Sequence, residues 1–241
     1  MSRTETFAKI LLGPLLLLQG MHTRRVTPKL PEAEGERDGV AGDGTPLRLL
    51  IIGDSAAAGV GAVTQNEALC GRLVSRLAAD YRVQWKLLAR SGLDSQALLA
   101  LLEQHGPESF DVVLLSIGVN DVTSNLAVEQ WIERQQRLMT LLCEQFAVKQ
   151  IVVSALPPMH LFPALPQPLR WYLGWRARVF NRHLADLAQR VDQCTMLTIN
   201  LAPQTGLMAS DGFHPGPRIY SQWADDAAQI IGRRFDKTPQ L

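Results

Sequence analysis

Ser55 stands where a serine could act as a nucleophile at the end of a buried strand. It follows the apolar run LLII at residues 49–52, Gly53 and Asp54, and α/β sheets bind their ligands where strands end. A serine attacks a carbonyl carbon when a base takes its proton, an acid orients that base, and donors stabilise the oxyanion. Asp and Ser also cap helices, and small residues let loops pack tightly, so this stretch alone does not separate catalysis from architecture.

His214 and Asp211 could supply the base and the acid. They lie three residues apart in the stretch SDGFHPG, after the last apolar run. This spacing can place the carboxylate against one ring nitrogen while the other nitrogen faces a serine, which fixes the tautomer and stabilises the imidazolium. A His-Asp pair can also be a capping arrangement, so the prediction depends on the other groups. The remaining histidines lie in less suitable segments: His22, His105, His160 and His183.

Asn120 and Gly92 could hold the oxyanion. Asn120 follows the strand-terminal Gly118 by two residues, just as Ser55 follows Gly53, and its amide can donate into the same crevice. Gly92 ends the second apolar stretch, where the missing side chain lets a backbone N–H face the oxyanion. Because Asn and Gly are also common turn formers, the prediction rests on their shared position at strand ends.

The elements that must position these groups alternate between apolar runs and amphipathic stretches. This βαβα rhythm predicts parallel strands with helices on both faces. Apolar residues at helical spacing predict helices over residues 65–80, 94–105 and 125–146. We therefore expect an α/β protein, a three-layer α/β/α sandwich with a five-stranded parallel sheet. The predicted strands are LRLLIIG (47–53), VQWKLLA (83–89), DVVLLSIG (111–118), KQIVVSAL (149–156) and CTMLTIN (194–200).

Four short blocks together resemble those of the SGNH/GDSL hydrolase family. They are Gly53-Asp54-Ser55, Gly92, Gly118-Val119-Asn120-Asp121 and Asp211-Gly212-Phe213-His214, in the family's order and usual spacing. The resemblance covers roughly residues 47–235 and implies a flavodoxin-like sandwich with Ser55 as nucleophile, His214 as base and Asp211 as the orienting acid. It also implies an oxyanion hole made by the Ser55 N–H, the Gly92 N–H and the Asn120 side chain. The family hydrolyses esters, thioesters and occasionally amides without a metal or cofactor.

Asp54 and the alanines that follow the serine carry the details of this prediction. We interpret Asp54 as a buried hydrogen-bonding support for the loop, because Asp211 is better placed to orient His214; a place for Asp54 in the triad is the alternative. Ala56 and Ala57 stand where many family members carry a larger residue followed by a small or hydroxylic one, which opens the wall beside the serine. The pattern G-x-S-x-G does not occur, which argues against the α/β-hydrolase version of this chemistry.

The predicted function is that of a serine esterase acting on carboxylic esters, thioesters or lipid acyl bonds through a Ser-His-Asp triad and an acyl-enzyme. The substrate would be a small-molecule or lipid ester. Acyl transfer to a sugar or alcohol would use the same triad, and it stays open. A non-catalytic module with GDSAAAG as an anion cradle is disfavoured, because a cradle has no use for Asn120, His214 and Asp211 together.

The composition fits one globular catalytic domain. The chain has 241 residues, of which 46% are hydrophobic. With Lys+Arg at 24 and Asp+Glu at 23, no overall field attracts nucleic acid, and we expect no such partner. Cys70, Cys143 and Cys194 lie far apart and predict buried thiols rather than a disulfide framework or a zinc site. We expect neither a metal nor a cofactor.

Residues 1–46 are predicted to form an N-terminal apolar segment and a linker, followed by the hydrolase domain over residues 47–236. The apolar segment at residues 7–21 is shorter than the roughly 20 residues that a spanning helix needs. Peripheral membrane contact through its leucines suits its composition, and a helix packed on the domain's own surface is the equal alternative. Cleavable export is less supported, because no small-residue cleavage pattern follows. Residues 31–46 are rich in Gly, Glu and Pro, and predict a linker.

Residues 157–170 (PPMHLFPALPQPLR) hold five prolines and predict an irregular excursion that overhangs the crevice. The aromatic residues Trp171, Tyr172 and Trp175 follow among arginines, which suits either a surface near lipid headgroups or packing on the core. We expect the apolar residues of the excursion to wall an acyl pocket. These predicted substrate-binding residues are Met159, Leu161, Phe162 and Leu165.

Overall fold

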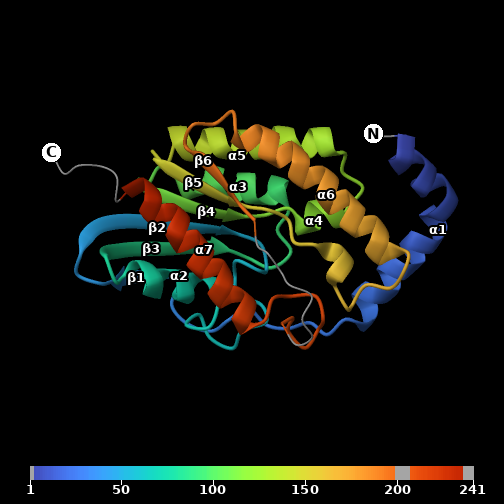
Figure 1. Cartoon of the computed structure of the whole chain (residues 1–241), viewed down its shortest axis with the longest axis horizontal. Coiled ribbons are helices and arrows are strands. Elements are labelled where there is room, and N and C mark those ends of the chain that lie inside the picture. The colour runs from blue at the N-terminus through green and yellow to red at the C-terminus, as the bar shows by residue number, and fades with distance from the viewer. Residues whose placement is uncertain (1–2, 199–206, 236–241) are drawn as a thin grey trace.

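A central β-sheet between two layers of helices forms the body of the molecule (Figure 1). The computed structural model describes residues 3–198 and 207–235. The strand order is β1-β3-β2-β4-β5-β6, in which β1 runs antiparallel to β3 and the other neighbours are parallel. The elements are α1 (Arg3–Val26), β1 (Asp38–Ala41), β2 (Thr45–Gly53), α2 (Leu69–Leu77), β3 (Tyr81–Ala89), α3 (Ser95–His105), β4 (Val112–Ser116), α4 (Val119–Thr123), α5 (Val128–Glu144), β5 (Gln150–Ser154), the short 3-10 helix η1 (Met159–Leu161), α6 (Leu169–Ala188), β6 (Cys194–Leu197) and α7 (Pro217–Phe235).

Each face of the sheet has its own hydrophobic core. Helices α3, α5 and α6 contribute to the core on one face, and α2 and α7 contribute to the core on the other. Strands β4 and β5 are buried along their whole length, as expected for parallel strands covered on both faces. The predicted α/β/α sandwich and its five parallel strands are therefore confirmed. The last predicted strand ended at residue 200, and residues 199–200 lie outside the described part of the chain.

Strand β1 is a sixth strand that the sequence analysis placed in a linker. Asp38 pairs with Lys86 and Ala41 with Val83, so this short strand closes the edge of the sheet beside β3. Its residues DGVA include Asp and Gly, which are depleted in strands, and the pattern is therefore not that of a strand. Backbone pairing with β3 therefore stabilises this strand despite its low strand propensity. Residues 31–46 thus belong to the folded domain and also contain the start of β2.

Helix α1 packs against α6 along one side only. Leu16 and Thr23 are buried on that side. Between them, Gln19 donates from Nε2 to the Gln167 carbonyl at 2.7 Å and accepts from the Leu169 N–H at 3.1 Å. Figure 1 shows α1 at one end of the molecule, beside the start of α6. Within residues 3–198 and 207–235, no helix combines the length and the apolar character needed to cross a membrane.

The position of β2 creates the crevice. It pairs with both β3 and β4, and Gly53 at its carboxyl end lies opposite Ala89 of β3 and Ser116 of β4. From β2 the chain continues to β3 on one side of β2 and then crosses to β4 on its other side. The carboxyl end of β2 is therefore the topological switch point, where open α/β sheets bind ligands. The loops that follow these three strands are therefore neighbours.

Candidate active site

Ser55, His214 and Asp211 form a continuous hydrogen-bonded relay. The Ser55 Oγ lies 2.9 Å from His214 Nε2, and His214 Nδ1 lies 2.6 Å from Asp211 Oδ2. In the sequence, the serine and the histidine are 159 positions apart. The structure therefore brings together the three residues that the sequence analysis assigned to catalysis.

Asp211 is held as a carboxylate by its surroundings. The residue is buried, and its second oxygen accepts the backbone N–H groups of Phe213 at 2.9 Å and His214 at 3.0 Å. Burial opposes the charge, but the hydrogen bonds from the His214 side chain and from these two N–H groups outweigh it. They hold the pKa of Asp211 below its ordinary value. An ionised Asp211 can orient the ring and stabilise its protonated form.

The turn that carries Ser55 requires glycine at its start. A Cβ atom added at Gly53 would lie 2.0 Å from the Ser116 carbonyl oxygen, so only glycine lets β2 and β4 approach this closely. After the strand, the Val60 N–H donates to the Ser55 carbonyl at 3.0 Å. The Tyr220 hydroxyl of α7 donates to the Val60 carbonyl at 2.6 Å. Helix α7 thereby stabilises the turn that carries Ser55.

Asp54 forms its side-chain hydrogen bond within this turn and not with His214. Its Oδ1 accepts the Ala56 N–H at 3.1 Å, and only 3% of the residue is exposed. Burial raises the pKa of Asp54 to about 7. The histidine's Nδ1 faces Asp211, so the geometry favours the support role over the alternative place in the triad.

The proposed oxyanion donors lie on the loops at either side of the Ser55 turn. Gly92 follows β3 with a φ of +84°, a conformation that favours glycine. Asn120 lies on α4 after β4, and its Nδ2 donates to the Leu93 carbonyl at 2.7 Å, which leaves its second amide hydrogen for a ligand. Among the described residues, no hydrogen bond engages the N–H of Ser55 or of Gly92. Each of these three groups thus keeps an N–H hydrogen for which the described residues supply no acceptor.

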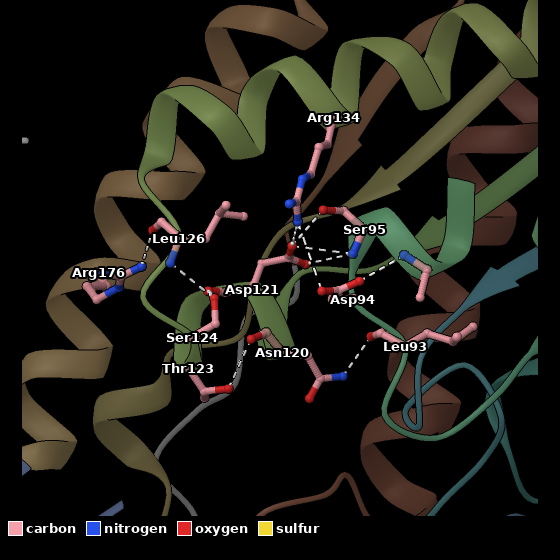
Figure 2. A network of polar contacts seen from close by, with 11 residues as sticks. Leu93, Asp94, Ser95, Asn120, Asp121, Thr123, Ser124, Leu126, Arg134 and Arg176 are labelled. Atoms are coloured by element: carbon pink, nitrogen blue, oxygen red, sulfur yellow. Dashed lines mark hydrogen bonds and ion pairs between the residues drawn. The ribbon is translucent and has the colours of Figure 1, made fainter. Parts of the chain in front are cut away.

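A buried carboxylate joins these two oxyanion loops, and the sequence analysis assigned it no role (Figure 2). Asp121 accepts from the Ser95 N–H at 3.0 Å and from the Ser95 hydroxyl at 2.6 Å. Arg134 of α5 approaches the same carboxylate at 3.5 Å and Asp94 at 4.0 Å. Burial raises the pKa of Asp121, whereas the hydrogen bonds from Ser95 act against this shift. No local sequence signal indicates this pairing, because Ser95 and Asp121 lie 26 positions apart in the chain.

An apolar cavity of about 60 Å³ adjoins Ser55. It lies at the carboxyl ends of β4 and β5, and His214 is one of its lining residues. Its apolar wall includes Ile117, Leu156, Phe162, Phe213, Ile219 and Trp223, with Ser116 and Ser154 as polar residues.

Of the four residues predicted to wall an acyl pocket, one lines this cavity. Phe162 lines the cavity, and Met159, Leu161 and Leu165 do not. Met159 and Leu165 are buried in the core on the α6 side of the sheet, because the excursion folds back onto α6 instead of overhanging the crevice with all its apolar side chains. Phe162 packs edge-on against Phe213 with ring centroids 5.1 Å apart, which couples the excursion to the loop of His214.

No group of three or more His, Cys, Asp or Glu side chains that could hold a metal ion occurs within the described residues. The three cysteines, Cys70, Cys143 and Cys194, are free thiols.

Comparison with known proteins identifies relatives of this chain. Residues 51–222 match the model of the GDSL-like Lipase/Acylhydrolase family. A GDSL-like esterase from Mycobacterium tuberculosis is 28% identical over 235 residues, an alignment that covers 88% of this chain and 74% of that protein.

Two solved structures share the fold. A member of the lipolytic protein G-D-S-L family from Veillonella parvula has a TM-score of 0.60 at 14% identity, and the match covers 77% of this chain and 98% of that one. The psychrotrophic esterase EstA from Pseudoalteromonas sp. has a TM-score of 0.59 at 19% identity, with 79% of this chain and 99% of that one covered.

Proposed function

The chain belongs to the GDSL-like lipase/acylhydrolase family and is a carboxylic ester hydrolase, and we propose that Ser55, His214 and Asp211 perform the hydrolysis through an acyl-enzyme. The observation that carries this proposal is the relay itself, with 2.9 Å from serine to histidine and 2.6 Å from histidine to aspartate. Both distances are those of hydrogen bonds: the first lets a proton pass from the serine to the histidine, and the second orients the histidine ring.

In the acylation half, the Ser55 Oγ attacks the ester carbonyl carbon while His214 Nε2 takes the hydroxyl proton. The carbonyl oxygen becomes an oxyanion, which the N–H groups of Ser55 and Gly92 and the amide of Asn120 stabilise. When the tetrahedral intermediate collapses, the bond to the alcohol breaks and His214 gives its proton to the leaving oxygen. Asp211 stays ionised throughout and stabilises the imidazolium.

In the deacylation half, water takes the place of the alcohol. His214 Nε2 removes a proton from the water as its oxygen attacks the acyl carbon, and the same oxyanion donors act again. Collapse of the second intermediate releases the carboxylic acid and returns the proton to Ser55 Oγ. The enzyme is thereby restored with no group consumed.

We assign the acyl group to the apolar cavity beside Ser55. Its volume is about 60 Å³, whereas a single water needs roughly 10–15 Å³ on the same kind of measure. The cavity thus accommodates an acyl group of only a few heavy atoms. Short acyl esters are the substrates that this geometry favours.

Turnover of p-nitrophenyl acetate by purified variants tests the proposal. We expect Ser55→Ala and His214→Ala each to lower kcat by about 10⁴-fold or more, because members of a triad act as a unit. Asn120→Ala should cost about 10²- to 10³-fold, as loss of one oxyanion donor does. The exposed Ser75 on α2 provides the control, and Ser75→Ala should keep wild-type turnover.

A fluorophosphonate probe supplies the second readout. It should label the wild-type protein and Ser75→Ala but not Ser55→Ala. Wild-type turnover by Ser55→Ala, in a preparation free of contaminating esterases, would contradict the assignment of the nucleophile.

A further inference from the structure

Helix α1 carries most of the exposed large apolar side chains in the described part of the chain. Leu11, Leu15 and Leu18 follow one another at spacings of four and three residues and therefore share one face of the helix. They are 61%, 44% and 65% exposed, and Leu17 and Met21 beside them are 70% and 68% exposed. We call these five residues the leucine face.

The leucine face is not needed to attach α1 to the protein. The opposite side of the helix already does so through the buried Leu16 and Thr23 and through the two hydrogen bonds of Gln19. Contiguous exposed apolar surface of this kind marks an interaction site rather than a packing surface.

The charged residues that follow the leucine face in the sequence are of one sign. No acidic residue occurs between Glu5 and Glu32, whereas Arg24 and Arg25 lie in the last turn of α1 and Lys29 follows. Both arginines are exposed. An apolar helix face beside basic residues suits a surface with apolar chains below and negative headgroups above. We propose that the leucine face, together with Arg24 and Arg25, binds the surface of an anionic lipid bilayer.

A second copy of the chain fits this face less well than a lipid bilayer does. Another molecule would bring the same basic residues to the interface. Between Glu5 and Glu32 it would bring no acidic residue with which they could pair. Complementary charge is what gives a protein interface its specificity. Anionic headgroups supply that complement, and acyl chains cover the leucines.

The position of α1 connects the proposed lipid surface with the catalytic loop. Gln19 of α1 contacts the carbonyl of Gln167, in the proline-rich excursion. In the same excursion, the Ala164 N–H donates to the Gly212 carbonyl at 3.1 Å, directly beside Asp211. Trp171, 43% exposed, lies on the first turn of α6, where its backbone N–H donates to the Gln167 side chain at 3.2 Å, and indole rings favour the interface between lipid and water. The catalytic loop is therefore connected, through the excursion, to the helix that carries the proposed lipid surface.

Vesicle co-sedimentation of the full chain tests this inference. We expect the protein to sediment with sucrose-loaded vesicles of equal phosphatidylcholine and phosphatidylglycerol, and less with phosphatidylcholine alone. The triple variant Leu11→Gln/Leu15→Gln/Leu18→Gln should lower the partition coefficient at least about tenfold, because three apolar side chains no longer enter the bilayer. Its turnover of soluble p-nitrophenyl acetate should equal that of the wild type, since none of these residues contacts the catalytic groups.

The matched control substitutes exposed valines elsewhere. Val40 on β1 and Val63 after the Ser55 turn are 54% and 74% exposed, and Val40→Gln/Val63→Gln should sediment with vesicles as the wild type does. Arg24→Gln/Arg25→Gln should weaken binding to the anionic vesicles by roughly fivefold per residue, with little effect on phosphatidylcholine vesicles. Because these arginines are exposed, this variant also tests the inference if the leucine variant fails to fold.

Several outcomes would overturn the inference. The first is a wild-type protein that does not sediment with anionic vesicles. The second is equal vesicle binding by the wild type and a folded leucine variant. The third is a protein that does not bind vesicles but forms a dimer, which the leucine substitutions dissociate. Lipid binding does not depend on catalysis, so Ser55→Ala should bind vesicles like the wild type. Failure of the lipid proposal and failure of the proposed mechanism are therefore separate results.

Discussion

Asp121 accepts hydrogen bonds from both the backbone N–H and the hydroxyl of Ser95, at 3.0 and 2.6 Å. Ser95 begins α3, three positions after Gly92, and Asp121 follows Asn120 on α4. A further hydrogen bond, from the Asn120 amide to the Leu93 carbonyl, joins the same two loops. The two loops that carry the proposed oxyanion donors are thus held to each other at two points. We therefore expect Asp121 and Ser95 to act as positioning residues for both donors.

The first prediction concerns the Ser95 hydroxyl. Ser95→Ala should lower kcat for p-nitrophenyl acetate about tenfold with little change in KM, because misplacement of a donor by a fraction of an ångström weakens transition-state binding. Ser95→Thr keeps a hydroxyl and should restore most of the rate. Ser124→Ala is the control, since the Ser124 hydroxyl donates to the Asp121 carbonyl and not to its carboxylate. If Ser95→Ala changed KM as strongly as kcat, and Ser95→Thr did not restore the rate, the result would indicate a general structural defect.

The second prediction concerns the orienting acid. Asp211→Asn should keep the fold, since the amide oxygen can still accept the Phe213 N–H, but lower kcat about 10⁴-fold by favouring the wrong histidine tautomer. The folded-state pKa of Asp211 is lowered. Its charge therefore stabilises the fold above the unfolded-state pKa, and this contribution disappears as pH falls through the folded-state pKa. The difference in unfolding free energy between wild type and variant should shrink in acid, as urea titrations at several pH values would reveal. Near-normal kcat for Asp211→Asn would remove Asp211 from the triad.

The third prediction concerns Asp54, whose pKa is raised to about 7 by burial. A carboxyl group with a raised folded-state pKa binds more protons when folded, so it destabilises the protein progressively as pH rises from about 4 to about 7. Asp54→Asn removes this titration and can still accept the Ala56 N–H. The variant should therefore gain stability relative to the wild type between pH 4.5 and pH 8, by on the order of a few kcal/mol. A stability difference that does not vary with pH would contradict this expectation.

The fourth prediction concerns acyl length. Phe162→Ala should enlarge the cavity beside Ser55 and raise kcat/KM for p-nitrophenyl butyrate relative to acetate, by about tenfold. Leu165→Ala is the matched control, because Leu165 is equally buried in the same excursion but does not line the cavity. Both variants should lose roughly 2–5 kcal/mol of stability. If the two chain-length profiles coincide, Phe162 does not determine acyl specificity.

Local sequence patterns were sufficient wherever a function follows directly from a strand end. Ser55, Gly92 and Asn120 each come shortly after an apolar run, and parallel strands end at one edge, so their proximity could be expected. His214 and Asp211 are three residues apart, a spacing that allows the contact seen between them. The helices expected over residues 65–80, 94–105 and 125–146 are shortened to α2, α3 and α5, a difference confined to their ends.

Features that depend on tertiary contacts escaped the sequence analysis. Strand β1 has weak strand propensity and exists through its partner β3. The excursion's apolar residues had no periodicity to tell which would face the cavity, so Phe162 could not be separated from Met159 and Leu165. Asp121 meets Ser95 across 26 positions of the chain, a pairing that neither residue's neighbours reveal.

The hydrogen bond from Tyr220 to the Val60 carbonyl has a consequence for how activity arises during folding. Strands β2 to β5 and the oxyanion loops are all complete in the chain before residue 160, but the base and the helix that fastens the nucleophile's turn come from residues 211–235. A partly synthesised or refolding molecule can therefore possess most of its sheet and remain inert toward esters. Recovery of esterase activity after denaturation thus measures the docking of α7, and it should lag behind the return of secondary structure.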